Sequence, residues 1–285
     1  MKTIVLPFDF SPNARAAMAC ALQLARSTES GLFVYHVLHE SPYKLAAASG
    51  ETAMDDLIRR DETEKTLALK EEVGKLEHVL NTGIDPERIR VKAEYNPLVV
   101  EKTIELAVSA GAGLIVMGTH GASGIRKFLF GSNTAHMIAR SPVPVLAIPE
   151  HYVYKPVRTL LYASDLEHLE EELGRLIPVA ISLHAGIEVL HLDYGYNDKK
   201  ISNEAAADII RSAAYQFIQL VTRKASLEKP LLKQVRHYLE EKNPDWLVMF
   251  TKEKSMWNKL FIGSRTEDMA QSLQVPLLSF KKPED

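Results

Sequence analysis

Cysteine and long uncharged runs are scarce in this chain of 285 residues. The single cysteine, Cys20, excludes an intrachain disulfide, which fits a reducing compartment. The longest stretch without a formal charge, Leu106–Ile125, is punctuated by five glycines and a histidine, so its apolar core is too short to span a bilayer. The opening apolar run ends at Asp9 and lacks the longer apolar region and cleavage site of a secretory signal. We expect a soluble cytoplasmic protein that binds no membrane.

The sequence also lacks a block of basic residues. Its formal net charge is −3, with acidic and basic residues interspersed, so we expect no nucleic-acid partner. Apolar residues make up 46% of the chain and charged residues 25%, which is typical of globular domains. The length suits one large or two ordinary domains.

Strand-like and helix-like segments alternate along the first half. A buried apolar or alternating pattern predicts strands, and small or apolar residues at helical spacing predict helices. Such alternation favours a parallel sheet covered by helices on both faces. The predicted strands are 3–8, 31–38, 88–95, 113–117 and 143–148, and the predicted helices are 12–26, 52–80, 97–110 and 133–140.

The second half repeats the first. Val116-Met117, Gly131-Ser132 and Val143-Pro144 recur at one offset of 132 positions, as Val248-Met249, Gly263-Ser264 and Val275-Pro276. Asp165 closes an apolar run as Asp9 does, at an offset near 155, so the second copy is shortened between its second and fourth strands. Repetition in this order indicates a tandem duplication. We predict two α/β domains, residues 1–150 and 151–285.

A glycine-rich segment follows the fourth predicted strand. Gly118 and Gly121 allow backbone N–H groups to approach a ligand, and the pair Gly131-Ser132 opens a helix whose N-terminus carries partial positive charge. Together they predict a phosphate site. In the second copy the positions of Gly118 and Gly121 hold Phe250 and Glu253, which would obstruct and repel a phosphate. We therefore expect one competent site, in the first domain.

The spacing Gly118-x2-Gly121-x9-Gly131-Ser132 resembles the signature of the ATP-binding branch of the universal stress protein family. Pro7-Phe8-Asp9 after the first strand, His36-Val37 at the second and Ser141-Pro142-Val143 near the fifth extend the resemblance. The chain is similar to a tandem two-domain member with a degenerate second domain. The resemblance implies two Rossmann-like domains of the adenine nucleotide alpha hydrolase type. Each would have a five-stranded, mainly parallel sheet flanked by helices.

The resemblance also implies which residues bind the nucleotide. The aspartate after the first strand and the backbone at the end of the second hold adenosine, and the glycine loop with the Gly-Ser pair holds phosphates. This chemistry agrees with the residue types, since a carboxylate suits ribose hydroxyls and a helix N-terminus suits phosphate. The implied residues are Pro7, Asp9, Val37, Met117, Gly118, Gly121, Gly131, Ser132 and Asn133, with no catalytic residue and no metal ligand.

Simpler interpretations stand beside these assignments. Asp9 could serve only as a turn residue, and Ser132 only as a helix N-cap. His36 and His191 occupy equivalent positions and are interpreted as packed histidines, and Cys20 as a buried structural thiol. The charged helix 52–80 is interpreted as a solvated surface element. A P-loop, a dinucleotide fingerprint after the first strand, and metal spacings such as His-x3-His are absent from the sequence.

Three functions stay open at this point. The leading one is an ATP-binding stress-response sensor or regulator, with ADP or AMP as other ligands and Mg²⁺ as a companion ion. The second is an interaction module that works through protein partners or another small ligand. The third is an ATPase, whose turnover we expect to be slow because no general base, arginine finger or metal-binding carboxylate pair is assigned. The resemblance also implies that the two domains pack as a pseudo-dimer through their last strands, 143–148 and 275–280, and further homodimerisation stays open.

Overall fold

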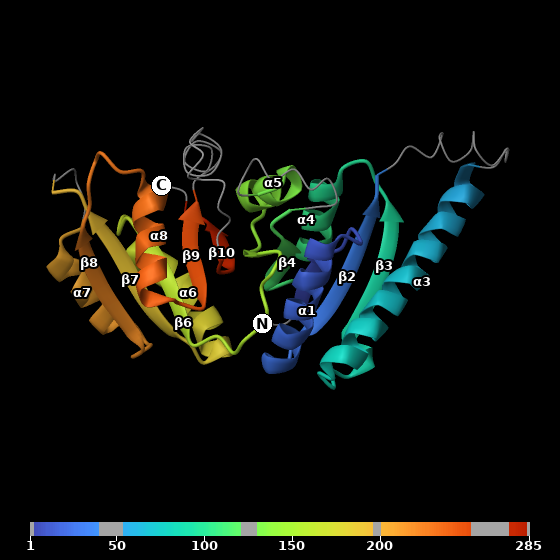
Figure 1. Cartoon of the computed structure of the whole chain (residues 1–285), viewed down its shortest axis with the longest axis horizontal. Coiled ribbons are helices and arrows are strands. Elements are labelled where there is room, and N and C mark those ends of the chain that lie inside the picture. Colours follow the sequence, from blue (N-terminus) through green and yellow to red (C-terminus); the bar gives the residue numbers. More distant parts are fainter. Residues whose placement is uncertain (1–2, 40–53, 121–129, 196–200, 252–273, 284–285) are drawn as a thin grey trace. The chain divides into compact units, whose positions relative to one another are not determined.

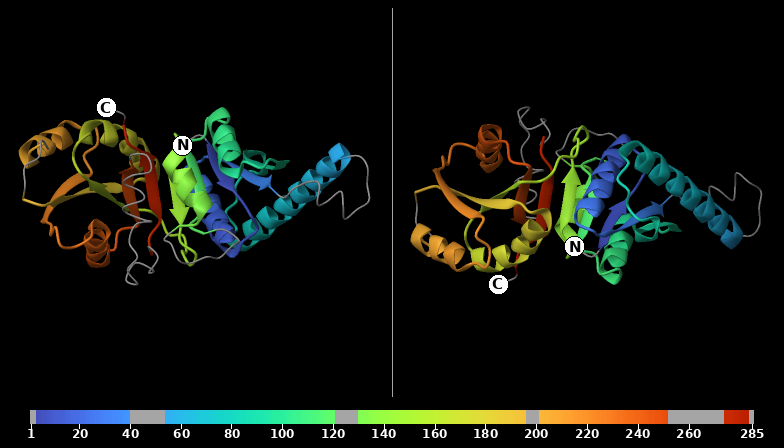
Figure 2. Two further views of the ribbon diagram at one scale, coloured as in Figure 1. Left: turned by 90° about the horizontal axis from the view of Figure 1, so that it is seen from above. Right: turned by 90° about the horizontal axis from the view of Figure 1, so that it is seen from below.

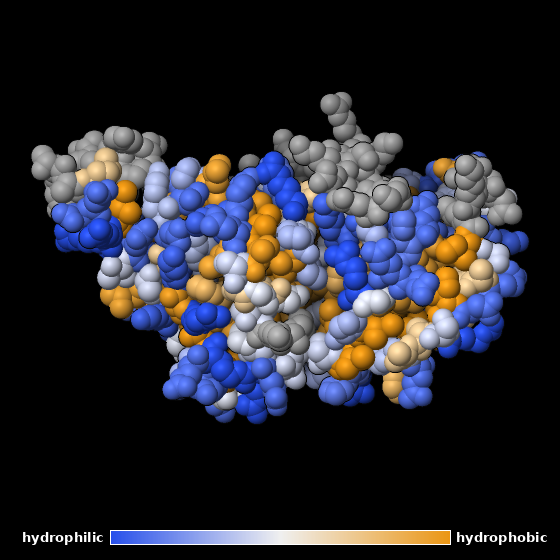
Figure 3. Space-filling model, turned by 180° about the vertical axis from the view of Figure 1, so that it is seen from behind, coloured by the Kyte–Doolittle hydropathy of each residue, from blue (hydrophilic) through white to orange (hydrophobic). Residues whose placement is uncertain are grey.

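The structure is a computed structural model that describes residues 3–39, 54–120, 130–195, 201–251 and 274–283. The chain divides into two compact units, the first built mainly from residues up to Tyr154 and the second mainly from Lys155 onward. Polar and apolar residues are interspersed on the face shown in Figure 3. No helix in the described ranges is long and apolar enough to cross a membrane.

Unit 1 is a parallel five-stranded sheet in the order β3-β2-β1-β4-β5 (Figure 1). Helices α1 and α3 lie on one face of this sheet and α4 on the other (Figure 2). The elements are β1 (Thr3–Pro7), α1 (Pro12–Ser27), β2 (Gly31–Leu38), α3 (Met54–Leu80), the short η1 (Pro86–Arg88), β3 (Ile89–Tyr95), α4 (Val99–Ser109), β4 (Leu114–Gly118), α5 (Ser132–Arg140) and β5 (Val145–Ile148).

Unit 2 has the same strand order, β8-β7-β6-β9-β10, which corresponds strand for strand to β3-β2-β1-β4-β5 and is again all parallel. Helices α6 and α7 lie on one face and α8 on the other (Figure 2). The elements are β6 (Thr159–Ser164), α6 (Leu169–Leu183), β7 (Gly186–Asp193), α7 (Asn203–Ser212), β8 (Ile218–Lys224), α8 (Leu231–Lys242), β9 (Trp246–Thr251) and β10 (Leu277–Lys281). The predicted α/β fold, with a mostly parallel sheet flanked by helices in each half, is confirmed. The predicted pseudo-dimer packing stays a prediction.

The duplication extends to the backbone of the turn after the first strand of each unit. In both copies the aspartate, Asp9 or Asp165, accepts a hydrogen bond of 3.1 Å at Oδ1 from the N–H two residues later. The residue between them is left-handed in both, with φ of 61° at Phe10 and 66° at Leu166. Left-handed backbone is uncommon outside glycine, so its recurrence in two copies indicates a shared turn.

Helix α1 begins as the sequence predicts. Ser11 is the N-cap and its hydroxyl accepts a bond of 3.1 Å from the backbone N–H of Ala14, with Pro12 at the first helical position. The face of α1 with small side chains is buried against the sheet and includes Cys20. Burial raises the pKa of the Cys20 thiol far above its ordinary value, which agrees with the interpretation as a buried structural group.

Helix α3 does more than the sequence interpretation assigned to it. Although most of its surface is exposed, Leu57, Leu69 and Val73 are buried. Thr66 Oγ1 accepts a bond of 3.0 Å from the N–H of Ala93, on the outermost strand β3. The helix therefore packs on the sheet and caps its edge.

Candidate functional site

The sheet of unit 1 has a switch point between β1 and β4, where the strand order reverses. Their pairing includes Ile4↔Leu114 and Val5↔Ile115, whereas β1 continues to Pro7 and β4 to Gly118. In open α/β sheets ligands bind outside the carboxyl ends of the strands at such a point. The residues predicted to bind a nucleotide are therefore expected around these two strand ends.

The start of α1 lies directly against the end of β4. A Cβ placed on Gly118 would come within 2.9 Å of both the Cβ and the backbone oxygen of Asn13. Side chains do not tolerate contacts this short, so only glycine permits the helix to approach the strand here. The absence of a side chain at Gly118 is thus explained by packing alone. Asn13 itself is 7% exposed, and its Oδ1 has no hydrogen-bond partner in the described part of the chain.

Two hydrogen bonds hold the start of α5 at the end of β4. The N–H of Gly131 donates to Thr119 O at 2.7 Å, and the hydroxyl of Thr134 donates to Gly118 O at 2.9 Å. Gly131 is the N-cap and makes no side-chain cap bond. The prediction that Ser132 caps this helix is wrong, because Ser132 is already its first helical residue. The first N–H groups of α5 lack intrahelical acceptors and form a ready anion site.

The backbone of Val37 points toward the end of β1 from the neighbouring strand β2. The register of β1 with β2 ends at Pro7↔Tyr35, so β2 extends past β1. Because Phe8 N donates to Tyr35 O, the backbone groups two residues further on, those of Val37, also point toward the β1 side. Among the described residues they have no recorded hydrogen-bond partner. A ligand at the end of β1 could use both groups.

Asp9 follows β1, the strand between β2 and β4, and its side chain is exposed. Its Oδ1 accepts from Ser11 N, so the turn role expected as an alternative is real. A carboxylate oxygen has several acceptor directions, and the turn therefore leaves a role in ligand binding intact.

His36 is a positioning group at this edge. Its Nδ1 lies 2.7 Å from Phe8 O, and its ring meets that of Phe10 edge-on at 5.1 Å. Burial lowers the pKa of His36, partly offset by the bond to the Phe8 carbonyl. In unit 2 the Nδ1 of His191 lies 3.3 Å from Ser164 O in the same arrangement. Both histidines tie the second strand to the end of the first, as the packed interpretation expected.

The structure places most of the predicted binding residues at the carboxyl edge of the sheet of unit 1. Met117 is 7% exposed at the end of β4, Asp9 and Val37 flank β1, and Ser132 and Asn133 are exposed at the start of α5. Pro7, Gly118 and Gly131 complete the set at the same edge. Gly121, together with Arg126 and Lys127, lies outside the described residues, as do Glu253 and the Gly263-Ser264 pair of the second copy.

In unit 2 aromatic rings pack together at the equivalent strand end. Phe250 takes the place of Gly118 and is 6% exposed. Its ring stacks on Phe280 at 4.7 Å with an interplanar angle of 10°, and it meets Tyr162 edge-on at 5.4 Å. The guanidinium of Arg175 lies 5.9 Å from the Phe250 ring and 5.8 Å from the Phe280 ring. The obstruction expected from Phe250 is therefore part of a packed cluster.

In unit 2 the aspartate after the first strand, Asp165, forms an ion pair with a lysine of the same chain. Lys282 Nζ lies 2.5 Å from Asp165 Oδ2 and 3.1 Å from Glu167 Oε2, with the lysine side chain 2% exposed. Burial acts to lower the pKa of Lys282, but the bonds and charge of Asp165 and Glu167 outweigh it and raise the pKa above its ordinary value. A charged lysine thus sits where unit 1 keeps its aspartate exposed.

Sequence reasoning missed Lys282 and Arg175. A sequence signal for Lys282 exists: at the repeat offset of 132 it corresponds to Glu150, so the charge at this position is reversed between the two copies. Arg175 lies in an ordinary amphipathic helix, and nothing in its spacing predicted the contacts with two rings.

Comparison with known proteins identifies the family of this chain. The family model for the universal stress protein family matches residues 1–149, more than half of the chain. The chain belongs to the universal stress protein family. A universal stress protein of Thermus aquaticus is 30% identical over 149 residues, covering 52% of this chain and 98% of the relative. The stress response protein NhaX of Bacillus subtilis is 26% identical over 162 residues, covering 51% of this chain and 96% of its own.

A solved structure supports the two-unit fold of this family member. The universal stress protein of Archaeoglobus fulgidus aligns over 98% of both chains with a TM-score of 0.65 and 19% identity. At that identity the match shows the fold and carries no functional detail. The assignment of a ligand therefore rests on the site itself.

Proposed function

We propose that this universal stress protein binds one adenine nucleotide, ATP, ADP or AMP, at the carboxyl edge of the sheet of unit 1. The observation that carries the proposal is that three groups lie at this one edge of the sheet: the start of α5, whose N-cap makes no side-chain cap bond, the exposed side chain of Asp9 and the backbone of Val37. Anion donors on one side and a carboxylate on the other match a molecule with phosphates at one end and ribose hydroxyls at the other.

Each group has a proposed role. The N–H groups at Ser132 and Asn133 bind phosphate, with the glycine loop completing the cradle and Mg²⁺ accompanying a triphosphate. Asp9 accepts bonds from ribose hydroxyls, and the Val37 backbone pairs with the edge of adenine. Met117 supplies an apolar wall. We place the protein in the cytoplasm as a stress-response sensor or regulator that reads nucleotide level, with slow turnover at most.

Unit 2 is proposed to bind no nucleotide in this way. The ring of Phe250 fills the position of the phosphate-side glycine, and Lys282 pairs with the aspartate that a ribose would need. A nucleotide would have to displace a stacked aromatic pair and a buried ion pair, which costs several kcal/mol.

Calorimetric titration with ATP tests the assignment through two equivalent aspartates. Asp9→Ala is expected to weaken ATP binding by about ten- to a hundredfold, since a hydrogen bond to a charged group contributes about 1.5–3 kcal/mol. Asp165→Ala is the matched control and is expected to leave ATP affinity unchanged while destabilising unit 2 by about 2 kcal/mol, because Lys282 loses a partner. Equal ATP binding by the parent chain and Asp9→Ala would remove Asp9 from the site. No binding by the folded parent would refute the function.

A further inference from the structure

Strand β8 is the outermost strand of unit 2 and pairs with β7 from Ile218 to Lys224. Phe217 O accepts from Ile187 N and Ala225 N donates to Asp193 O, so odd-numbered backbone groups face β7. Successive residues alternate along a strand. The backbone groups of Leu220, Thr222 and Lys224 therefore point outward, and in the described part of the chain no acceptor is recorded for their N–H groups.

The outermost strand of unit 1, β3, differs from β8 because its outward N–H groups have hydrogen-bond acceptors. On β3 the outward N–H groups of Ala93 and Tyr95 donate to Thr66 Oγ1 at 3.0 Å and Glu62 Oε1 at 2.8 Å. Both acceptors come from α3, a helix of 27 residues that lies along β3 (Figure 1). The corresponding helix of unit 2, α7, has 10 residues, and the hydroxyl of Thr222 on β8 donates a bond to the side chain of Asn203 on this helix, which leaves the β8 backbone groups unused. The shortening of the second copy has thus left β8 as an open edge.

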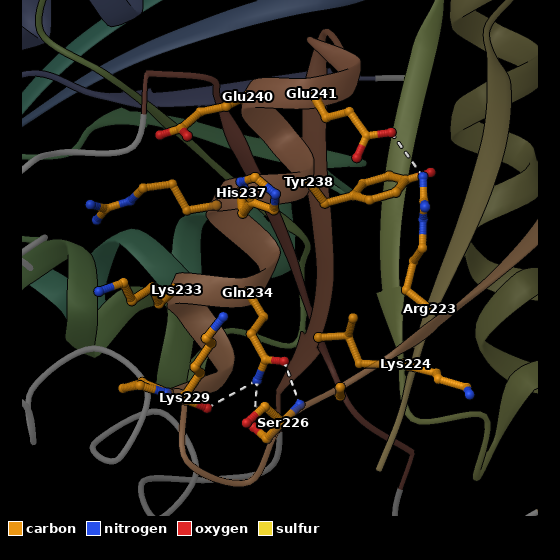
Figure 4. Close-up of a pocket in the computed structure, with 14 residues that line it drawn as sticks. Arg223, Lys224, Ser226, Lys229, Lys233, Gln234, His237, Tyr238, Glu240 and Glu241 are labelled. Atoms are coloured by element: carbon orange, nitrogen blue, oxygen red, sulfur yellow. Dashed lines mark hydrogen bonds and ion pairs between the residues drawn. The ribbon is translucent and has the colours of Figure 1, made fainter. Parts of the chain in front are cut away.

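A groove of about 900 Å³ lies beside this edge, between the end of β8 and α8 (Figure 4). Its lining includes five arginines or lysines against two glutamates, in a chain whose net charge is −3. One glutamate, Glu241, is already neutralised by Arg223 at 2.8 Å. For Lys224, Lys229 and Lys233 no ion pair is recorded within the described ranges. The open edge is therefore bordered by positive charge.

The loop that carries part of this charge is held in place. Gln234 Nε2 donates to Ser226 O at 3.0 Å and to Lys229 O at 2.9 Å, and Ser226 N donates to Gln234 Oε1 at 2.8 Å (Figure 4). One side chain thus fixes three peptide groups between β8 and α8. A fixed loop lowers the entropy lost when a partner binds.

We propose that the β8 edge and its basic groove dock an extended acidic polypeptide segment, which adds to the sheet as a further strand. The outward backbone groups of Leu220, Thr222 and Lys224 supply hydrogen bonds that an extended polypeptide matches in spacing. Lys224, Lys229 and Lys233 select carboxylate side chains and repel basic ones. This surface is separate from the proposed nucleotide site of unit 1, so the proposal stands independently of the proposed function.

The test uses the full-length chain and two labelled peptides of about eight residues, which suits a strand. One alternates valine with glutamate and the other alternates valine with lysine. Fluorescence anisotropy is expected to show saturable binding of the acidic peptide, weakened by salt, and none of the basic peptide. Hydrogen exchange is expected to slow at the amides of Leu220, Thr222 and Lys224 when the acidic peptide binds.

Two variants locate the effect. Thr222→Pro removes an outward N–H without touching the ladder to β7, and Lys224→Glu reverses a charge; each should weaken the acidic peptide by about tenfold. Lys70→Glu makes the same charge change on an exposed position of α3 and should leave binding unchanged. If Thr222→Pro does not fold, Lys224→Glu and the exchange pattern decide the question.

Three results would overturn the proposal. They are failure of the acidic peptide to bind, equal binding to Lys224→Glu and the parent, and protection confined to amides outside β8. Protection of β8 that depends on protein concentration without peptide would instead assign the edge to a second copy of the chain.

Discussion

At the scale of single residues, an important difference between the two copies is the replacement of a glycine by a phenylalanine at the end of the fourth strand. Gly118 allows α1 to meet β4, and its counterpart Phe250 anchors a ring cluster that includes Phe280. The sequence predicted that this difference would separate a competent site from an impaired one. The sequence could not predict that Asn13 leaves no room for a side chain at position 118, because the two residues are far apart in the chain. Substitution of Gly118 therefore tests packing before it tests binding.

Gly118→Ala is expected to lower the free energy of unfolding by about 1–3 kcal/mol, because the new Cβ meets Asn13 backbone at 2.9 Å. Gly74→Ala is the control, since nothing lies within 4 Å of a Cβ at that position on α3. It should stabilise the chain by up to about 1 kcal/mol, the helix-propensity difference. Urea unfolding measures both. Unchanged stability of Gly118→Ala would mean that α1 can shift away from β4.

A buried carboxyl in unit 2 gives a pH-dependent prediction. Glu172 is 1% exposed, and burial raises its pKa, partly offset by the bond that Tyr162 OH donates to it and by the charge of Lys282. The folded state therefore holds the Glu172 proton to higher pH than the unfolded state. Stability contributed in this way is present below the ordinary glutamate pKa and is lost as pH rises through the folded pKa.

Glu172→Gln is expected to remove this dependence. Between the ordinary pKa and the raised one, the parent should lose stability relative to the variant by at most about 1.4 kcal/mol per pH unit. Urea unfolding at a series of pH values from about 4 to 8 measures the difference, over a window that starts at the ordinary glutamate pKa. The stability of Glu170→Gln, a change at an exposed position of the same helix, should vary with pH as the stability of the parent does. A parallel curve for Glu172→Gln as well would mean that Glu172 is ionised in the folded state.

At the scale of elements, the helices were predicted from the apolar face that each buries, and the central strands from short apolar runs, because β1, β4 and β5 are buried on both faces. The described strands of unit 1 agree with the predicted ranges within two residues, and α5 begins one residue early because Gly131, and not Ser132, is its cap. The second role of α3 was not predictable from its charged pattern. Thr66 and Glu62 read as surface residues, and only the tertiary structure shows that they accept bonds from an edge strand.

Removal of both acceptors should open the edge of unit 1. The double variant Glu62→Ala, Thr66→Ala is expected to speed hydrogen exchange at Ala93 and Tyr95 and to cost about 1–3 kcal/mol, because two backbone N–H groups lose their partners. Glu64→Ala, at an exposed position of the same helix, should change neither. Unchanged exchange at Ala93 and Tyr95 would show that water replaces the two side chains without loss.

At the scale of the whole molecule, the chain is a duplication whose copies share a fold and differ in the residues at the end of the fourth strand. The repeated matches in the sequence predicted both the fold and the loss of the second glycine loop. They did not predict that Lys282 and Arg175 would lie at the corresponding edge of unit 2, because both reach it only through the tertiary fold. The glycine loop itself, with Gly121, lies outside the described residues, so its part in binding stays a prediction.

The central claim is one nucleotide site per chain. Native mass spectrometry of the full-length protein with Mg²⁺ and a series of ATP concentrations tests it most directly, because it counts bound ligands. We expect at most one nucleotide on the parent chain and on Asp165→Ala, and at an ATP concentration that just fills the parent site a much smaller bound fraction on Asp9→Ala. Two nucleotides on the parent, or an equal bound fraction on the parent and Asp9→Ala at that concentration, would contradict the account.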